Sequence, residues 1–215
     1  PHDRKVTLAE PLDGPTHQRL SSLAAELSIT LLVGSVAERL DDTKAYNTSL
    51  LFGPDGALIA HYRKMHLFDV DLAASGGVRF KESDTTGRGG DLVVADTSVG
   101  RVGLTICFDL RFPEMYRALC DQGATLLTVP SAFTLMTGKD HWHTLLKARA
   151  IENQAWVIAP GQWGPHDDEG LRMSYGHSLI VDPWGTVVAE CGDGEGFCLA
   201  EMDLDKTDRI RGQIP

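Results

Sequence analysis

Apolar and polar positions follow two different periods along this chain, and each period predicts one kind of element. Between residues 16 and 27 the apolar side chains recur every three or four positions, which predicts an amphipathic helix. Residues 29–36 form a continuous apolar run of strand length, which predicts a buried strand. Residues 47–52 and 57–62 flank the turn sequence Gly-Pro-Asp-Gly at 53–56, and we expect them to form a hairpin.

The second half of the chain alternates strand-like and helix-like segments. Strands are predicted at residues 92–96, 99–106, 125–129, 155–159, 178–181, 186–190 and 197–202. Helices are predicted at residues 113–122, 140–153 and 205–211. Residues 73–90 are rich in Gly, Ser, Thr and charge, which is typical of a long functional or mobile loop. Strands that alternate with helices and are interrupted by hairpins indicate one α/β domain over residues 1–215, with mixed sheets.

Charge and composition exclude several classes of protein. A net charge of −10 over 215 residues is unfavourable for a surface that binds nucleic acid or an anionic membrane. No apolar run approaches the ~20 residues that span a bilayer. The four cysteines, at positions 107, 120, 191 and 198, lack CxxC spacing, so we expect no zinc site and a reducing, cytoplasmic location.

A candidate nucleophile stands at the end of an apolar strand. Residues 99–106 lead into Cys107, and polar, turn-forming residues follow before a helix can begin. A thiol in that place is held on rigid backbone and can face a cleft. An inert buried thiol is the commoner state of a single cysteine. The charges of Asp109, Arg111 and Glu114 nevertheless indicate an organised site.

Two further segments place charged or titratable side chains on apolar elements. Residues 57–62 deliver Lys64 to the end of a predicted strand, although most lysines in such positions are simply solvated. Residues 141–154 read His-Trp-His-Thr-Leu-Leu-Lys-Ala-Arg-Ala-Ile-Glu-Asn-Gln. His141 and His143 lie two positions apart and point to different faces of the predicted helix, so they cannot share a metal ion.

Seven short motifs occur in a fixed order across most of the chain. They are Tyr62-Arg-Lys-Met-His-Leu-Phe, Phe80-Lys-Glu-Ser, Cys107-Phe-Asp-Leu-Arg-Phe-Pro-Glu, Pro130-Ser-Ala-Phe, His141-Trp, Arg149-Ala-Ile-Glu-Asn, and Tyr175-Gly-His-Ser with Asp182-Pro-Trp-Gly. In these motifs the chain resembles the carbon–nitrogen hydrolase (nitrilase) superfamily, and more narrowly its Nit branch of amidases, which includes the ω-amidases. Any one motif would be a weak signal, but their common order is specific.

The resemblance implies both a fold and a set of site residues. The implied fold is a four-layer α-β-β-α sandwich, with two mixed sheets flanked by helices. Cys107 matches the nucleophile, Lys64 matches the oxyanion stabiliser, and the backbone N–H of Phe108 is the second donor. Glu82 matches the family's supporting glutamate, which positions Lys64 and the acyl site.

Further expectations concern the substrate pocket and the partners. Ser131 and Phe133 follow a predicted strand end and are candidates to line the acyl pocket. Arg149, Glu152 and Asn153 are expected to pair with one another as structural groups. The expected ligand is a small linear amide, with no metal, cofactor, nucleic acid or membrane. Because the family pairs through its outer helices, the resemblance implies a homodimer or higher homo-oligomer.

The general base of the family has no match in this chain. The family mechanism needs a glutamate after a strand near the N-terminus, upstream of Lys64. Glu10 lies in a polar loop that matches the segment after that glutamate, Glu38 follows the segment that matches the next strand, and Glu26 lies on the wet face of the first helix. We therefore expect a fragment that lacks N-terminal strands and a C-terminal tail, with the base upstream of Pro1.

The leading hypothesis is a cytoplasmic amidase that releases ammonia from a small linear amide through a thioester on Cys107. A nitrilase and an N-carbamoyl amidase are alternatives within the family. A catalytically incomplete hydrolase fold that acts as a binding or scaffold protein is an alternative of another class. A papain-like protease is a third alternative. It needs a histidine beside Cys107, yet none of the eight histidines stands in a papain-type context.

Overall fold

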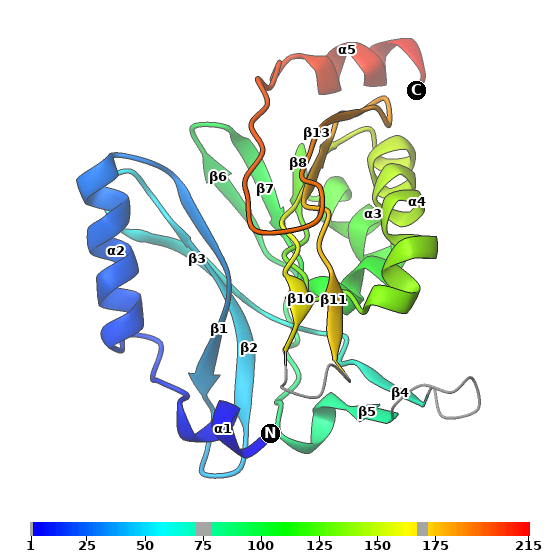
Figure 1. Ribbon diagram of the computed structural model, residues 1–215. Helices are drawn as coiled ribbons and strands as arrows, with labels where there is room; N and C mark the ends of the chain where they lie inside the picture. The colour runs from blue at the N-terminus through cyan, green and yellow to red at the C-terminus, as the bar shows by residue number, and fades with distance from the viewer. Residues whose placement is uncertain (1, 72–78, 167–171) are drawn as a thin grey trace. The chain divides into compact units, whose positions relative to one another are not determined.

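The computed structural model describes residues 2–71, 79–166 and 172–215 (Figure 1). The chain divides into two compact units, Pro1–Val93 and Val94–Pro215. The predicted single domain over residues 1–215 stays a prediction. No helix in the described ranges combines the length and apolarity that a bilayer crossing requires.

In the first unit, one helix packs on a three-stranded antiparallel sheet of order β1-β2-β3. The elements of this unit are α1 (His2–Thr7), α2 (Pro15–Leu27), β1 (Leu31–Arg39), β2 (Ala45–Phe52), β3 (Leu58–Arg63), β4 (Asp69–Asp71), β5 (Arg79–Lys81) and the 3-10 helix η2 (Glu82–Asp84). Ala24 of α2 packs against Leu50 and Phe52 of β2. Figure 1 shows α2 running along this sheet. The amphipathic face of α2 therefore supplies the core of the first unit.

The predicted helix and hairpin of this unit are confirmed, as α2 and β2–β3, but two other predictions are wrong. The strand predicted to be buried is β1, whose side chains apart from Glu38 are half-buried or exposed. It is an edge strand that pairs only with β2 among the described strands, so burial is incomplete. The predicted loop at 73–90 contains β5 and η2, and its residues 73–78 lie outside the described ranges. The three-residue strands β4 and β5 are too short to show a period.

In the second unit, a six-stranded mixed sheet has the order β13-β12-β9-β8-β7-β6. The elements of this unit are β6 (Val94–Thr97), β7 (Gly100–Leu104), the 3-10 helix η3 (Cys107–Arg111), α3 (Pro113–Asp121), β8 (Leu126–Thr128), α4 (Leu135–Asn153), β9 (Trp156–Ala159), β10 (Trp163–Pro165), β11 (Met173–Tyr175), β12 (Leu179–Val181), β13 (Val187–Glu190) and α5 (Lys206–Gln213). Strands β7, β8 and β9 are parallel, and the other neighbours pair antiparallel. Helices α3 and α4 contact each other, and Figure 1 shows both on one side of this sheet.

Most predicted elements of the second unit are confirmed, including the mixed sheet, and two details are corrected. Helix α4 begins at Leu135 rather than at residue 140. Its first turns contain Gly138, where a Cβ atom would collide with Tyr175, so the glycine reflects close packing and not a helix end. The predicted strand at 197–202 does not form, because none of the described strands pairs with it. Phe197 and Leu199 are 84% and 82% exposed there.

Candidate active site

The predicted nucleophile lies where the chain leaves strand β7, next to the edge strand β6, and enters η3. Cys107 is the first residue of η3, and its backbone N–H donates a hydrogen bond of 3.0 Å to Pro130 O. Its φ is +50°, a left-handed conformation that is uncommon for a residue other than glycine. Strained backbone of this kind concentrates at functional sites and persists only where the surroundings enforce it. The turn therefore has the geometry expected of a positioned nucleophile.

Buried polar groups hold the turn on both sides of Cys107. The fully buried carboxylate of Asp109 accepts a 2.8 Å hydrogen bond from the backbone N–H of Ile106. Arg149 of α4 donates two hydrogen bonds, of 3.1 and 2.7 Å, to Leu110 O. These contacts fix the backbone immediately before and after the thiol. Together with the hydrogen bond from the Cys107 N–H to Pro130 O, they support the left-handed conformation at Cys107.

The predicted internal pairing within α4 is confirmed. Arg149 Nη1 lies 2.8 Å from Glu152 Oε1, and Asn153 Nδ2 donates a 2.9 Å hydrogen bond to Arg149 O. Beneath the turn, the hydroxyls of Thr105 and Tyr116 lie 2.7 Å apart. Burial raises the pKa of Tyr116, so this hydroxyl stays protonated and serves as a hydrogen-bonding group of the core.

Arg111 places a cation near the thiol and against the predicted pocket wall. Burial lowers the pKa of Arg111, and the negative charge of the Cys107 thiolate acts in the opposite direction. Its guanidinium lies 5.3 Å from the ring centroid of Phe133 and 3.2 Å from Nδ1 of His141. Arg111 therefore contacts the α4 helix through His141.

The pocket-lining candidates lie on the segment that follows β8. Phe133 is 6% exposed and packs against Trp142, with ring centroids 5.1 Å apart. The hydroxyl of Ser131 donates a 3.1 Å hydrogen bond to Val129 O, and its backbone N–H donates a 2.9 Å hydrogen bond to Pro160 O. The hydroxyl of Ser131 is thus engaged within the protein, whereas Phe133 offers an apolar wall. Phe108 packs edge-on against Phe112 at 5.6 Å.

The first unit holds the other two predicted catalytic residues as a direct pair. Lys64 Nζ lies 2.5 Å from Glu82 Oε2. The same oxygen of Glu82 accepts a 2.7 Å hydrogen bond from the backbone N–H of Phe68, and its Oε1 lies 3.4 Å from Asn47 Nδ2. The backbone of Lys64 is fixed as well, because its N–H donates to Asn47 O at 2.9 Å. The structure thus joins the two residues that the sequence places 18 positions apart.

A second lysine of this unit was not predicted. Lys5 in α1 donates a 2.8 Å hydrogen bond to Thr86 Oγ1. Burial lowers the pKa of Lys5, the charge of Glu82 raises it, and the charge of Lys64 lowers it further. Lys5 therefore belongs to the same electrostatic cluster as the Lys64–Glu82 pair. No local sequence motif predicts this role of Lys5, because its contacts with distant residues arise only when the chain folds.

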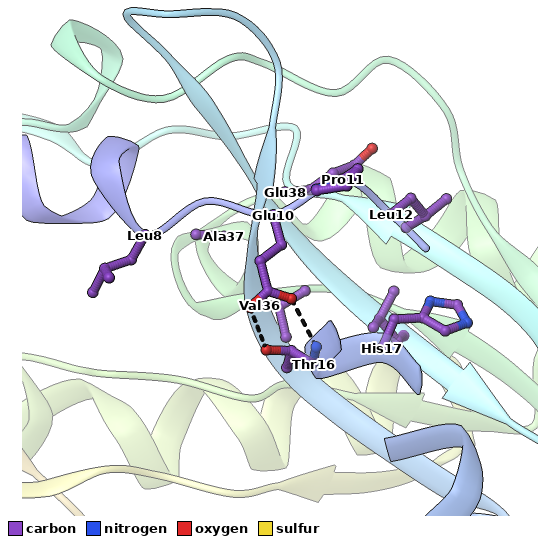
Figure 2. Close-up of a pocket in the computed structure, with 10 residues that line it drawn as sticks. Leu8, Glu10, Pro11, Leu12, Thr16, His17, Val36, Ala37 and Glu38 are labelled. Atoms are coloured by element: carbon purple, nitrogen blue, oxygen red, sulfur yellow. Dashed lines mark hydrogen bonds between the residues drawn. The ribbon is translucent and has the colours of Figure 1, made fainter. Parts of the chain in front are cut away.

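The acidic residues considered for the general base are engaged in structural contacts within the first unit. Glu10 accepts hydrogen bonds from the backbone N–H and the hydroxyl of Thr16, at 2.7 and 2.9 Å (Figure 2). Glu38 is 5% exposed and accepts hydrogen bonds from Thr48 Oγ1 at 2.7 Å and from Arg63 Nε at 2.9 Å. Both glutamates line a cavity of about 180 Å³. Their contacts agree with the expectation that neither is the base.

Comparisons with known proteins identify the family of the chain. The profile of the carbon–nitrogen hydrolase family matches residues 1–212. The deaminated glutathione amidase of Mus musculus is 47% identical over 215 residues, which cover 98% of this chain and 65% of the mouse protein. The omega-amidase NIT2 of Homo sapiens is 44% identical over 207 residues, which cover 96% of this chain and 73% of the human protein. The crystal structure of the C. elegans NitFhit protein matches with a TM-score of 0.92 and 42% identity, over 100% of this chain and 52% of that chain.

The chain belongs to the carbon–nitrogen hydrolase family. The predicted Nit-branch resemblance and the predicted α/β fold class of the nitrilase type are confirmed. The papain-like protease alternative is wrong, because the chain belongs to the carbon–nitrogen hydrolase family and not to the papain family. The chain spans 65% of the length of the mouse relative, which is less than two thirds.

Proposed function

We propose that this protein is an amidase that hydrolyses a small linear amide to a carboxylate and ammonia, with Cys107 as the nucleophile. The observation that carries the proposal is the anchored, left-handed turn at Cys107, at the end of a parallel strand, in a chain of this family. The relatives named deaminated glutathione amidase support hydrolysis of an amide bond, and the relative named omega-amidase supports a substrate with a terminal amide.

The proposed reaction proceeds in two halves. Cys107 loses its proton and its thiolate attacks the amide carbon, and the carbonyl π electrons move to oxygen. The tetrahedral intermediate collapses to a thioester as the nitrogen takes up that proton and leaves as ammonia. Water then attacks the thioester and the C–S bond breaks. One water proton returns to the Cys107 sulfur and the other goes to the ammonia, which leaves the carboxylate, ammonium and the free thiol. The sum is amide plus water to carboxylate plus ammonium, with no electron transferred.

Four other groups have proposed roles in this reaction. The ammonium of Lys64 and the backbone N–H of Phe108 would stabilise the oxyanion of each tetrahedral intermediate. Glu82 would position Lys64 through the 2.5 Å contact and keep its charge compensated in the resting state. Phe133 would form an apolar wall of the acyl pocket. Neither Glu10 nor Glu38 is proposed as the base, because each carboxylate already binds donors within the first unit.

Assembly and location are also part of the proposal. We propose a cytoplasmic protein that forms a homodimer or higher homo-oligomer and needs no cofactor for amide hydrolysis. The scattered thiols support the location, because all four cysteines are present as thiols in the structure. The resemblance to the Nit branch supports the assembly. Light scattering of the purified protein across a range of concentrations measures its oligomeric state.

Product release from matched substrates tests the activity. A short dicarboxylate monoamide is expected to release ammonia and deaminated glutathione is expected to release cysteinylglycine, while the nitrile and the N-carbamoyl compound that correspond to the monoamide are turned over more slowly. Cys107→Ala is expected to abolish turnover, and acyl-enzyme trapped at Cys107 should be detectable by mass spectrometry. Lys64→Met is expected to cut turnover severely. Lys64→Arg is not expected to restore turnover, because it replaces a compact ammonium group by a larger, planar guanidinium group. A folded protein that turns over none of the four compounds would favour the scaffold alternative.

A further inference from the structure

A cluster of two imidazoles and one carboxylate lies in the second unit, outside the residues proposed for amide chemistry. His143 belongs to α4, His177 lies in the connection between β11 and β12, and Glu190 is the last residue of β13. Glu190 Oε1 lies 2.8 Å from His143 Nε2 and 3.0 Å from His177 Nδ1. One ligand-type atom from each of the three residues lies within 4.8 Å of the other two. Three elements far apart in sequence thus direct three metal-ligating groups at one point.

The separations suit a small tetrahedral ion. With Zn–N and Zn–O distances of about 2.0–2.2 Å, the ligand atoms of a tetrahedral zinc site lie roughly 3.2–3.5 Å apart. The two contacts of Glu190 are a few tenths of an ångström shorter than that, and the longest separation in the cluster is 4.8 Å. Ion binding therefore requires Glu190 to move back slightly and the two imidazoles to approach one another. A ligating imidazole nitrogen must be unprotonated, so the ion would displace any proton that these nitrogens carry.

The surroundings of His177 orient its ring as a ligand. Its Nε2 lies 3.3 Å from Asp193 Oδ1, so Nδ1 is free for a metal when Nε2 carries the proton. The Tyr175 ring stacks on the imidazole with centroids 4.3 Å apart. Trp142 Nε1 donates a 2.8 Å hydrogen bond to the His177 carbonyl, which fixes the backbone. A carboxylate behind a ligating histidine is a recurrent feature of metal sites, because it sets the tautomer and increases ligand basicity.

We propose that His143, His177 and Glu190 bind one divalent transition-metal ion, with Zn²⁺ the best match. Two imidazoles and one carboxylate suit zinc and its neighbours, whereas Mg²⁺ and Ca²⁺ prefer oxygen ligands only. The three side chains are partly exposed, at 33%, 23% and 35%, so water can reach the ion and complete its coordination. The bound ion ties α4 to β13 and to the segment before β12.

This site has a consequence for the neighbouring pocket wall. The backbone N–H of Tyr175, two residues before His177, donates a 2.9 Å hydrogen bond to Phe133 O. An ion at His177 therefore stiffens the segment that supports Phe133. The sequence expectation of no metal was based on cysteine spacing and on the different faces of His141 and His143. His141 indeed contacts Arg111, and His143 finds its partners on other elements.

Metal titration of the full chain tests the proposal without an activity readout. The Cys107→Ala background removes the reactive thiol as a competing ligand. Calorimetric titration with Zn²⁺ is expected to give one equivalent, and Co²⁺ is expected to give the visible absorption of a four-coordinate site. His143→Ala and Glu190→Gln are expected to abolish this binding, and Asp193→Asn to weaken it about 10–100-fold. His61→Ala is the matched histidine control and is expected to bind like the parent.

A second measurement keeps the result interpretable if a variant folds poorly. Zn²⁺ is expected to raise the melting temperature of the parent and of His61→Ala, but not that of His143→Ala, whose side chain is partly exposed on α4. Cys191→Ser with Cys198→Ser is expected to keep the site. No saturable binding, binding that survives both His143→Ala and Glu190→Gln, or binding that is lost with the two cysteines would overturn the proposal. Stabilisation by acid alone, without any effect of Zn²⁺, would also overturn it and define an ion pair of protonated histidines.

Discussion

Lys64 Nζ lies 2.5 Å from Glu82 Oε2, and only 2% of the lysine surface is exposed. Burial acts to raise the pKa of Glu82, but the charge and hydrogen bond of Lys64, with the Phe68 N–H and the charge of Lys5, together hold the pKa below its ordinary value. Desolvating two charges offsets much of their attraction, so a buried pair is weak grounds for stability as such. The pair is better explained as a device that presents a charged ammonium at a fixed place.

The Glu82→Gln variant is expected to unfold more easily, by about 3 kcal/mol, because it leaves the buried Lys64 charge without a counter-charge. Asp84→Asn is the matched control in the same 3-10 helix. The Lys81–Asp84 pair is exposed on both sides, so its loss should cost less than about 1 kcal/mol. Urea unfolding at pH 7 measures both. Equal effects of the two variants would contradict a buried, structurally important pair.

The pH dependence of the stability difference between the parent protein and Glu82→Gln follows from the direction in which the pKa of Glu82 is shifted. Since the folded pKa of Glu82 is lowered, its stabilisation is fully present above the unfolded value of 4.5 and is lost as the pH falls through the folded value. The stability difference between the parent protein and Glu82→Gln should therefore shrink on acidification below pH 4.5. A difference that stays constant down to pH 3 would show that the charge of Glu82 is not responsible.

The four thiols are expected to react at very different rates. Burial raises the pKa of Cys120 to about 11, and burial also raises the pKa of Cys198. Cys107 has the cation of Arg111 nearby, which favours its thiolate. Iodoacetamide at pH 8 should therefore alkylate Cys107 first, as peptide mapping by mass spectrometry can show, with activity lost in step. Activity lost in step with labelling of Cys120, Cys191 or Cys198 would contradict the assignment of the nucleophile.

The backbone at Cys107 gives a prediction about stability. Because φ is +50° there, Cys107→Gly should relieve strain that Cys107→Ala keeps, and the glycine variant should be more stable than the alanine variant by about 1 kcal/mol. Cys120 in the last turn of α3 is the control, where the order should reverse, because glycine is the poorer helix former. Thermal unfolding of the four variants measures both differences. The same order at both positions would show that the turn at Cys107 is unstrained.

The sequence predicted those elements whose structure is determined by neighbouring residues in the chain. Gly53-Pro-Asp-Gly56 predicted its hairpin because turn chemistry acts over four residues. The run into Cys107 predicted the strand, and the following polar residues predicted the turn. The strand expected at 197–202 failed, because an alternating apolar pattern forms a strand only where a neighbour can pair with it.

The contacts of the site depended on the fold more than on the motifs. Lys64 and Glu82 were paired by resemblance, and Lys5 joins them through a contact with Thr86 that no spacing shows. The partners of His143 come from β13 and from the segment before β12, so no pattern within α4 marks them. Such contacts become visible only when long-range packing is known.

Substitution of Glu38 and Glu10 distinguishes a structural role of these glutamates from a catalytic one. Glu38→Gln should destabilise the protein by about 1.5–3 kcal/mol, because it replaces a buried carboxylate that binds Arg63 and Thr48. Glu10→Gln should cost about 0.5–1 kcal/mol, because its carboxylate caps the start of α2 through Thr16. Under conditions where both variants are folded, the rate of ammonia release should change less than threefold. Loss of a general base typically costs about 10²–10⁴-fold, so a fall of that size in either variant, with stability unchanged, would assign the base to that residue.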